Sequence, residues 1–164
     1  MRIEVRGSAT ARDGAALWPV YDAVFGDHPT YHGWRESVWD RHRTRPGFRL
    51  ARAHKTGLVG FAYGYTGEQG QWWTDQARAA LPSDVADEWL GGHFEVVSIG
   101  VLDDHRRRGV GRALFRALLD GLTHDRLLLM TTADEIDPAR RLYAAEGWRV
   151  LGPGIGVATV ILGS

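Results

Sequence analysis

One short stretch of the chain, H-R-R-R-G-V-G-R from His105 to Arg112, combines residue types that can bind an anion. An apolar, β-branched run (F-E-V-V-S-I-G-V-L) precedes it, and apolar residues at helical spacing follow it, which predicts a corner between a strand and a helix N-terminus. The first N–H groups of a helix lack partners within the helix, and glycine lets a ligand approach the backbone closely. Arginine adds forked donors that match phosphate oxygens. The corner therefore favours a pyrophosphate site, with a glycine-rich turn bearing solvated arginines as the alternative.

Two common phosphate-binding motifs do not fit this corner. A P-loop requires G-K-[ST], which does not follow the glycines. A dinucleotide-binding fingerprint has a different glycine spacing and comes at the start of its domain, whereas this corner lies late in the chain. The corner therefore belongs to another kind of anion site.

The composition of the 164-residue chain fits a single domain and excludes several function classes. The 20 basic and 20 acidic residues cancel, so a nucleic-acid partner is not expected. Cysteine is absent, which removes disulfides, thiolate metal sites and a cysteine nucleophile. No signal-peptide core and no run near ~20 apolar residues is present, so a cytoplasmic protein without membrane contact is expected. The excess of Arg over Lys, with abundant Ala and Gly, indicates a GC-rich bacterial genome.

Hydrophobic periodicity and turn residues predict an α/β fold around one sheet. Strands are expected at 2–6, 48–54, 58–65, 94–102, 126–132, 148–151 and 157–162, and helices at 13–25, 34–45, 109–122 and 137–146. Pro19 is expected in the first turn of the first helix or at a kink, and Trp34, Val38 and Trp39 on the buried face of the second. Residues 66–92 are expected to be an irregular insert with two short helices separated at Pro82. No linker divides the chain, so one domain covering 1–164 is predicted.

The anion-binding corner resembles the signature of a known family. R-R-R-G-V-G, from Arg106 to Gly111, matches the R/Q-x-x-G-x-G/A motif of the GNAT superfamily of acyl-CoA N-acyltransferases. Farther on, A-R-R-L-Y-A-A-E-G-W, from Ala139 to Trp148, resembles the family segment A-x-x-L-Y-x-x-x-G-F. The resemblance implies a mixed, mostly antiparallel sheet of six or seven strands with helices on both faces.

The resemblance also implies a donor and the residues that hold it. The donor is acetyl-CoA or another acyl-CoA, and no metal is expected. Backbone N–H groups of the corner would wrap the pyrophosphate, and the preceding strand would bond the pantetheine across a gap between strands 94–102 and 126–132. The implied cofactor-binding residues are Ile99, Gly100, Val101, Arg106, Arg107, Arg108, Gly109, Val110, Gly111, Arg112, Asp137, Arg140 and Tyr143. Many family members have Asn at the position of Asp137, so helix capping is an alternative role for this residue.

Acyl transfer to an amine requires removal of a proton, stabilisation of an oxyanion and protonation of the leaving thiolate. Tyr143 has the position of the family's thiolate-protonating tyrosine, with a core tyrosine as the alternative. Glu95 is the candidate general base, acting through water, or else a carboxylate paired with an arginine at the strand edge. His93 lies two residues away and either shares the role of base or ends the loop.

The candidate acceptor-binding residues lie in two segments. His28, Tyr31, His32 and Trp34 are expected in a loop between the first two helices, where Pro29 and Gly33 disfavour a helix and metal binding by the histidines is not expected. Trp72, Trp73 and Trp89 of the insert either cover the sheet edge or wall an apolar or cation-binding acceptor pocket, with His93 nearby in sequence.

These residues favour an acetyl-CoA-dependent N-acetyltransferase that acts on a small-molecule amine by direct attack. A non-catalytic acyl-CoA sensor is the alternative from another class, and the presence of both Glu95 and Tyr143 favours the enzyme. A protein N-terminal or lysine acetyltransferase and a different acyl donor also remain open. Homodimers are common in the family, but no interface can be identified from the sequence.

Overall fold

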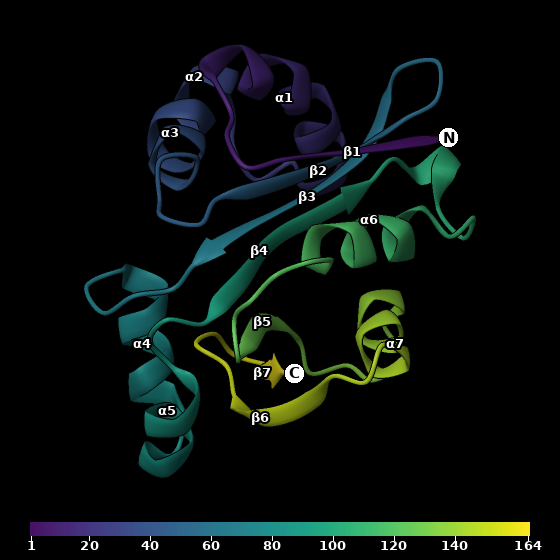
Figure 1. Ribbon diagram of the computed structural model, residues 1–164. Helices are drawn as coiled ribbons and strands as arrows, with labels where there is room; N and C mark the ends of the chain where they lie inside the picture. The colour runs from purple at the N-terminus through teal and green to yellow at the C-terminus, as the bar shows by residue number, and fades with distance from the viewer. The chain divides into compact units, whose positions relative to one another are not determined.

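The computed structural model describes residues 1–164, and the chain forms two compact units. The first unit contains residues 1–65 and 96–122, and the second contains residues 66–95 and 123–164. The elements follow the order β1 (Arg2–Arg6), α1 (Ala11–Phe25), α2 (Tyr31–Trp34), η1 (Arg35–Trp39), α3 (Asp40–His42), β2 (Arg49–His54), β3 (Leu58–Thr66), α4 (Trp72–Ala80), α5 (Ser83–Trp89), β4 (Phe94–Val101), η2 (Asp103–His105), α6 (Val110–Leu119), β5 (Leu127–Thr132), α7 (Pro138–Ala145), β6 (Arg149–Pro153) and β7 (Thr159–Gly163) (Figure 1).

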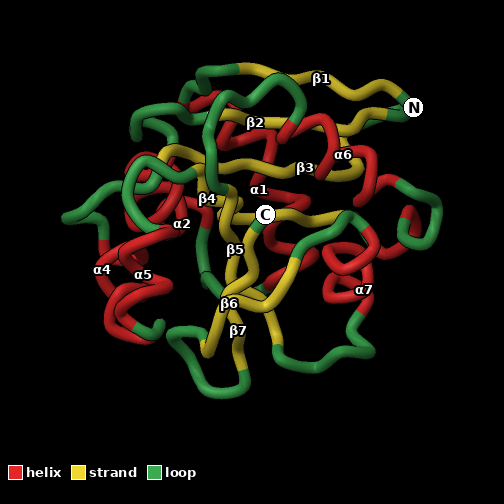
Figure 2. The backbone as a smooth tube through the Cα atoms, turned by 60° about the horizontal axis from the view of Figure 1, so that its bottom comes forward, coloured by secondary structure: helices red, strands yellow, loops and turns green.

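The strands form a mixed seven-stranded sheet, as the family resemblance implies, and their order in the sheet is β1-β2-β3-β4-β5-β7-β6. In the first unit β1 pairs antiparallel with β2, and β2 pairs antiparallel with β3, which confirms the predicted hairpin (Figure 2). In the second unit β5 lies antiparallel to β7, which also pairs with β6. The start of β4 pairs parallel with β5, with Phe94 opposite Leu127 and Glu95 opposite Leu128.

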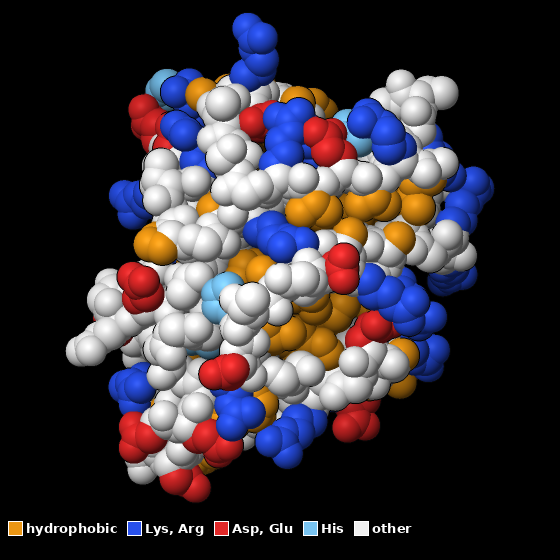
Figure 3. Space-filling model, in the orientation of Figure 1, with side chains coloured by type: hydrophobic (Ala, Val, Ile, Leu, Met, Phe, Trp, Pro, Cys, Tyr) orange, Lys and Arg blue, Asp and Glu red, His pale blue; other side chains and the backbone are white.

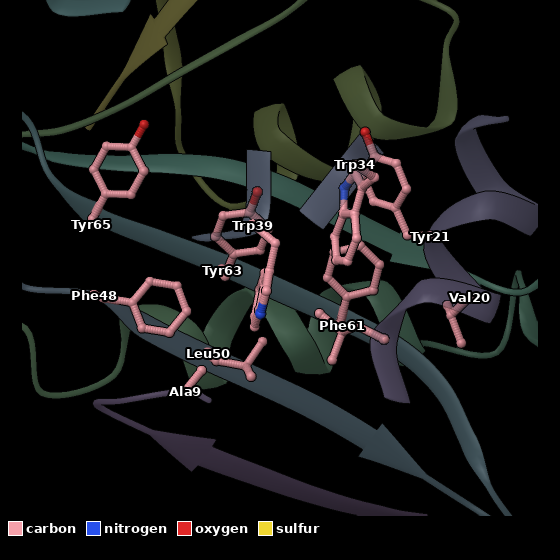
Figure 4. Close-up of a cluster of buried hydrophobic side chains, with 11 residues drawn as sticks. Ala9, Val20, Tyr21, Trp34, Trp39, Phe48, Leu50, Phe61, Tyr63 and Tyr65 are labelled. Atoms are coloured by element: carbon pink, nitrogen blue, oxygen red, sulfur yellow. The ribbon is translucent and has the colours of Figure 1, made fainter. Parts of the chain in front are cut away.

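An aromatic cluster forms the core of the first unit between β2–β3 and the helices α1, α2 and η1 (Figure 4). Its buried members are Ala9, Leu17, Val20, Tyr21, Trp34, Trp39, Phe48, Leu50, Phe61, Tyr63 and Tyr65. Helix α1 begins at a capping box in which Thr10 and Asp13 bond each other's backbone, and it ends at Gly26 in the left-handed conformation. Pro19 lies inside this helix rather than in its first turn, which leaves the second of the two expected positions, at a kink.

The second helical segment begins earlier than the sequence predicts and contains a wider turn. Thr30 caps it, because its hydroxyl accepts a 3.1 Å hydrogen bond from the Gly33 N–H, and the helix starts at Tyr31 despite Pro29 and Gly33. Residues Arg35–Trp39 form a π-helical turn. This turn places Trp34 and Trp39, five residues apart, in a stack with ring centroids 5.6 Å apart and an interplanar angle of 19°.

Helix α6 lies on the other face of the first unit's strands from α1 (Figure 1). A Cβ at Gly60 of β3 would lie 3.0 Å from Leu114 of α6, whereas the neighbouring residue Phe61 belongs to the aromatic cluster. The helix starts at Val110 and ends at Leu119, three residues before the predicted end. Gly121, with φ +76°, follows it in the left-handed conformation that ends helices.

The core of the second unit lies between the insert and β5–β7. Trp73, Ala77, Leu81, Ala86, Trp89 and Leu90 pack with Leu128 and Ile161. The insert is therefore largely helical, with α4 and α5 separated at Pro82 as expected. Trp89 lies directly over the C-terminal strand, since a Cβ at Gly163 would be 2.7 Å from its ring. Helix α7 contacts β5 and begins at Asp137–Pro138, as predicted.

Candidate functional site

The arginine–glycine corner has the backbone geometry of an anion cradle. Gly109 has φ +78° and is the N-cap residue of α6, and no side chain caps the helix. Arg107 also has a positive φ, +59°, which is uncommon for a residue other than glycine and stores strain. The first N–H groups of α6 therefore have no side-chain acceptor at the end of the helix that carries its partial positive charge.

The three consecutive arginines of the corner have different roles. The Arg106 Nε donates a 3.2 Å hydrogen bond to the carbonyl oxygen of Val101 and lies 3.2 Å from Asp103 Oδ1, so this side chain closes the loop on itself. Arg107 and Arg108 are exposed. Arg107 and Arg108 are therefore accessible to a ligand, whereas Arg106 stabilises the loop.

The strand before the corner is irregular at the residues expected to contact pantetheine. Val97 packs against the aromatic cluster, and a Cβ at Gly100 would meet Phe61 and Val24 of the same cluster. In a regular strand, residues three apart point to opposite faces. The pattern indicates a bulge around Ile99, a device that redirects backbone groups and is over-represented beside active sites.

In the second unit, Glu95 and Tyr143 are both buried, with exposed fractions of 4% and 5%. Burial, with a smaller contribution from the charge of Asp137, raises the pKa of Tyr143 to about 12. The phenol is therefore protonated at neutral pH and suited to donate a proton rather than to accept one. Glu95 is held in β4 opposite Leu128 of β5.

His93 precedes β4 and is held by hydrogen bonds from Gly91 and Gly67, which lie at the two ends of the insert. Its Nδ1 accepts a 3.0 Å hydrogen bond from the Gly91 N–H, and its carbonyl oxygen accepts one of 2.7 Å from the Gly67 N–H. Burial, and secondarily the nearby His124, lowers the pKa of His93 to about 4. With Nδ1 occupied as an acceptor, the proton of the neutral ring is on Nε2, which is buried without a hydrogen-bond partner. His93 thus has no lone pair available to act as a base.

Asp137 and Arg140 both make local structural bonds in α7. The Asp137 carboxylate accepts a 2.8 Å hydrogen bond from the Ala139 N–H and caps the helix. Arg140 Nη1 donates a 3.1 Å bond to the carbonyl oxygen of Thr132, at the end of β5. These contacts account for both residues without a ligand, so their cofactor contacts stay predictions.

The candidate acceptor residues divide into buried and exposed ones. Trp34 has 0% exposure and Trp73 9%, whereas Trp72 is 64% exposed. The Tyr31 hydroxyl donates to the carbonyl oxygen of Ala11 at 3.2 Å and ties α2 to α1. His28 Nδ1 lies 2.8 Å from Asp27 Oδ1 in the partly exposed turn after α1.

The structure also brings together four residues that the sequence did not single out. Arg45 Nη1 donates a hydrogen bond to the Tyr65 hydroxyl, and the guanidinium carbon lies 4.7 Å from the centroid of that ring. His42 Nδ1 is 2.8 Å from the Tyr63 hydroxyl oxygen. Two sequence features could have identified these residues: the basic run R-H-R-T-R (41–45), and two tyrosines two residues apart in one strand, which therefore lie on the same face.

The structure contains neither a cluster of metal-ligating side chains nor a helix that could span a membrane. No group of three or more His, Cys, Asp or Glu side chains is arranged to hold a metal ion. None of the helices is both long enough and apolar enough to span a membrane. Basic and acidic side chains are interspersed on the face drawn in Figure 3, consistent with 20 residues of each sign.

Comparisons with known proteins agree with this geometry. The sequence pattern of the acetyltransferase (GNAT) family matches residues 15–148. The chain is 37% identical over 98 residues to the GCN5-like protein acetyltransferase Rv2170 of Mycobacterium tuberculosis, an alignment that covers 56% of this chain and 48% of that protein. The chain thus spans about half the length of this relative.

Solved structures show the same fold at low sequence identity. An acetyltransferase from Thermus thermophilus superposes with a TM-score of 0.68 at 18% identity, covering 100% of this chain and 97% of the other. The ribosomal-protein-S18-alanine N-acetyltransferase of Escherichia coli superposes with a TM-score of 0.64 at 16% identity, covering 99% and 92%. With the family pattern spanning most of the chain, the protein belongs to the GNAT family of acetyltransferases.

Proposed function

We propose that the protein transfers an acetyl group from acetyl-CoA to the primary amine of a small molecule by direct attack. The observation that carries the proposal is the corner at Gly109, whose positive φ and uncapped helix N-terminus suit a pyrophosphate. A side chain at Gly109 would meet nothing within 4 Å, so the backbone there is open to a ligand. The corner residues and the irregular part of β4 would hold the donor, which supplies a thioester carbonyl for the amine to attack.

The acid role is assigned to Tyr143 and the base role to Glu95, both of which are buried in the second unit. Tyr143, protonated because its pKa is raised to about 12, would donate a proton to the leaving sulfur. Glu95 would accept the proton of the attacking ammonium through water. His93 does not compete for this role, because its Nδ1 already accepts the Gly91 N–H.

A protein acceptor is the second candidate. It is favoured by one observation, the name of the 37% identical mycobacterial relative, which is a protein acetyltransferase. A panel of small primary amines and a panel of peptides with free N-termini or lysines, assayed by release of free thiol from acetyl-CoA, separates the two. Turnover with peptides alone would replace the small-molecule proposal.

A thermal shift with acetyl-CoA, with ATP as the control, tests donor binding before any acceptor is known. Ligand at about 100 times its dissociation constant adds ~2.7 kcal/mol of stability, or several degrees for a domain of this size. A shift with acetyl-CoA that exceeds the shift with ATP supports the proposal. No shift at millimolar acetyl-CoA would refute the donor role of the corner.

A further inference from the structure

The basic run at the end of α3, residues 41–45, contains one arginine that pairs with a carboxylate and two that do not. Arg43 is neutralised, because its Nε lies 2.8 Å from Asp40 Oδ1 and its Nη1 donates to the carbonyl oxygen of Ala9. Asp40 also pairs with Arg35, at 3.1 Å. No carboxylate pairs with Arg41 or Arg45. The run therefore leaves two positive charges uncompensated on one side of the first unit.

Arg45 is held in a fixed position even though it has no acidic partner. Its guanidinium stacks on the buried Tyr65 ring, and one of its five N–H donors goes to the Tyr65 hydroxyl. Tyr65 is 1% exposed, so the surface under the guanidinium is rigid. The side chain is only partly exposed, and its remaining donors have no acceptor in the protein. An arginine fixed in this way has already lost the entropy that a flexible side chain loses on binding.

The neighbouring side chains extend the surface beside Arg45. His42 lies next to Tyr65, with ring centroids 5.3 Å apart, and its Nδ1 bonds with the Tyr63 hydroxyl. The hydroxyls of Tyr63 and Tyr65 point to the same side of the cluster, away from Leu50 and Ala9 (Figure 4). Burial, followed by the charges of Arg45 and Arg41, lowers the pKa of His42 to about 4. The imidazole is therefore neutral, and the positive charge is on the two arginines.

We propose that Arg41, His42, Arg45, Tyr63 and Tyr65, together called the arginine–tyrosine cluster, bind the carboxylate of an amine acceptor. The acceptor class is then a primary amine that also carries a carboxylate. A planar guanidinium matches the two oxygens of a carboxylate, and the buried Tyr65 ring beneath it holds the guanidinium in position. The identification of the ligand as the acceptor rests on the proposed acetyl transfer, whereas the anion site itself does not.

The first experiment measures anion binding without acetyl-CoA. Benzoate, neutral benzamide and phenyl phosphate are titrated into protein with isotope-labelled histidine, and the His42 ring resonances, assigned with His42→Gln, are followed by NMR. Benzoate is expected to shift these resonances and to raise the pKa of His42, because a bound anion offsets Arg45 and Arg41. Benzamide is expected to leave them unchanged.

Two variants and a matched control locate the site. Arg45→Gln is expected to weaken benzoate binding about tenfold or more, the effect of losing a charge-assisted hydrogen bond. Tyr65→Phe keeps the ring and removes only the hydroxyl that orients Arg45, so a smaller loss is expected. Arg12→Gln removes the same charge from an exposed position in the first unit and is expected to leave the affinity unchanged. An unshifted His42, an Arg45→Gln affinity within twofold of wild type, or equal binding of benzamide would overturn the site, and tighter binding of phenyl phosphate would overturn its assignment to a carboxylate.

The second experiment connects the site to the acceptor. The values of kcat/KM for 4-(aminomethyl)benzoate and 4-(aminomethyl)benzamide are compared in the wild type and in Arg45→Gln. A preference of at least tenfold for the carboxylate, lost in the variant, supports the acceptor assignment. Benzoate binding without turnover of any amine would refute the proposed function and leave the anion site standing, whereas turnover without a carboxylate preference would refute the acceptor assignment alone.

Discussion

Substitution Gly67→Ala is expected to destabilise the protein through one contact. A Cβ at Gly67 would lie 2.1 Å from His93 Nε2, 2.2 Å from Cε1 and 2.8 Å from Cδ2. Ordinary contacts require about 3.5 Å, so the ring would have to move by about 1.5 Å. His93 is 1% exposed and is bonded through both its Nδ1 and its carbonyl oxygen, so it has little freedom to move.

The cost should reach the upper end of the overpacking range, about 3 kcal/mol. For a chain of this length, that corresponds to a fall in melting temperature of roughly 6–12 °C. Thermal unfolding of the wild type, Gly67→Ala, His93→Ala and the double variant forms a complete cycle. Because His93→Ala removes the ring, Gly67→Ala in that background should cost less than about 1 kcal/mol, which gives a coupling energy of about 2 kcal/mol.

Gly7→Ala is the matched control, since its Cβ would meet nothing within 4 Å and its φ is not positive. It should change the stability by no more than about 0.5 kcal/mol. Additive effects of Gly67→Ala and His93→Ala, within about 0.5 kcal/mol, would refute the packing argument. They would also show that the His93 ring can move away from residue 67.

Three further predictions concern the catalytic groups, the corner and pH. Tyr143→Phe should lower kcat by about a hundredfold, while the thermal shift with acetyl-CoA stays unchanged. In the wild type, the pKa of Tyr143 is raised to about 12, so ionisation of the phenol should not lower the rate below about pH 10. Gly109→Ala forces a side chain into φ +78° without a clash, so it should cost about 1–2 kcal/mol of stability and reduce the acetyl-CoA thermal shift. His42 and His93 have pKa values lowered from 6.5 to about 4, so the unfolded chain binds protons between these values and the folded protein does not. The free energy of unfolding should therefore be constant above about pH 6.5 and fall by roughly 1–3 kcal/mol per histidine as the pH falls to 4. In His93→Gln, the free energy of unfolding measured by chemical denaturation should fall less steeply with decreasing pH.

The sequence predicted the order of strands and helices well because each element has a local signal. The alternation in β1, the turn in the β2–β3 hairpin and the cap at Asp137–Pro138 each depend on a few neighbouring residues. The turn at η1 has no such signal. Regular helical periodicity brings residues three or four apart together, but the π-helical turn brings Trp34 and Trp39 together at a spacing of five. Their stacking is a tertiary effect that the helical pattern alone could not indicate.

In the candidate site, too, some features depend on neighbouring residues in the sequence and others on tertiary contacts. Gly109 and Tyr143 could be found from motifs, because the backbone geometry and the helix that hold them are encoded nearby. The protonation state of His93 could not, because it depends on a hydrogen bond from Gly91 and on burial under the insert. The sequence therefore proposes two candidate bases two residues apart, and the hydrogen bond from Gly91 favours Glu95 over His93.

The arginines show why pairing, rather than charge alone, decides which of them stays available to an anion. Arg52 is 7% exposed and lies between Glu4, at 3.1 Å, and Asp13, at 3.2 Å, so its charge is neutralised within the fold. Arg126 pairs with Glu88 at 2.8 Å. Arg45 is bonded to a tyrosine hydroxyl instead, and a neutral hydroxyl orients a guanidinium without cancelling its charge. A sequence with equal numbers of acidic and basic residues can thus still attract an anion, because neutrality over the whole chain does not require neutrality at each arginine.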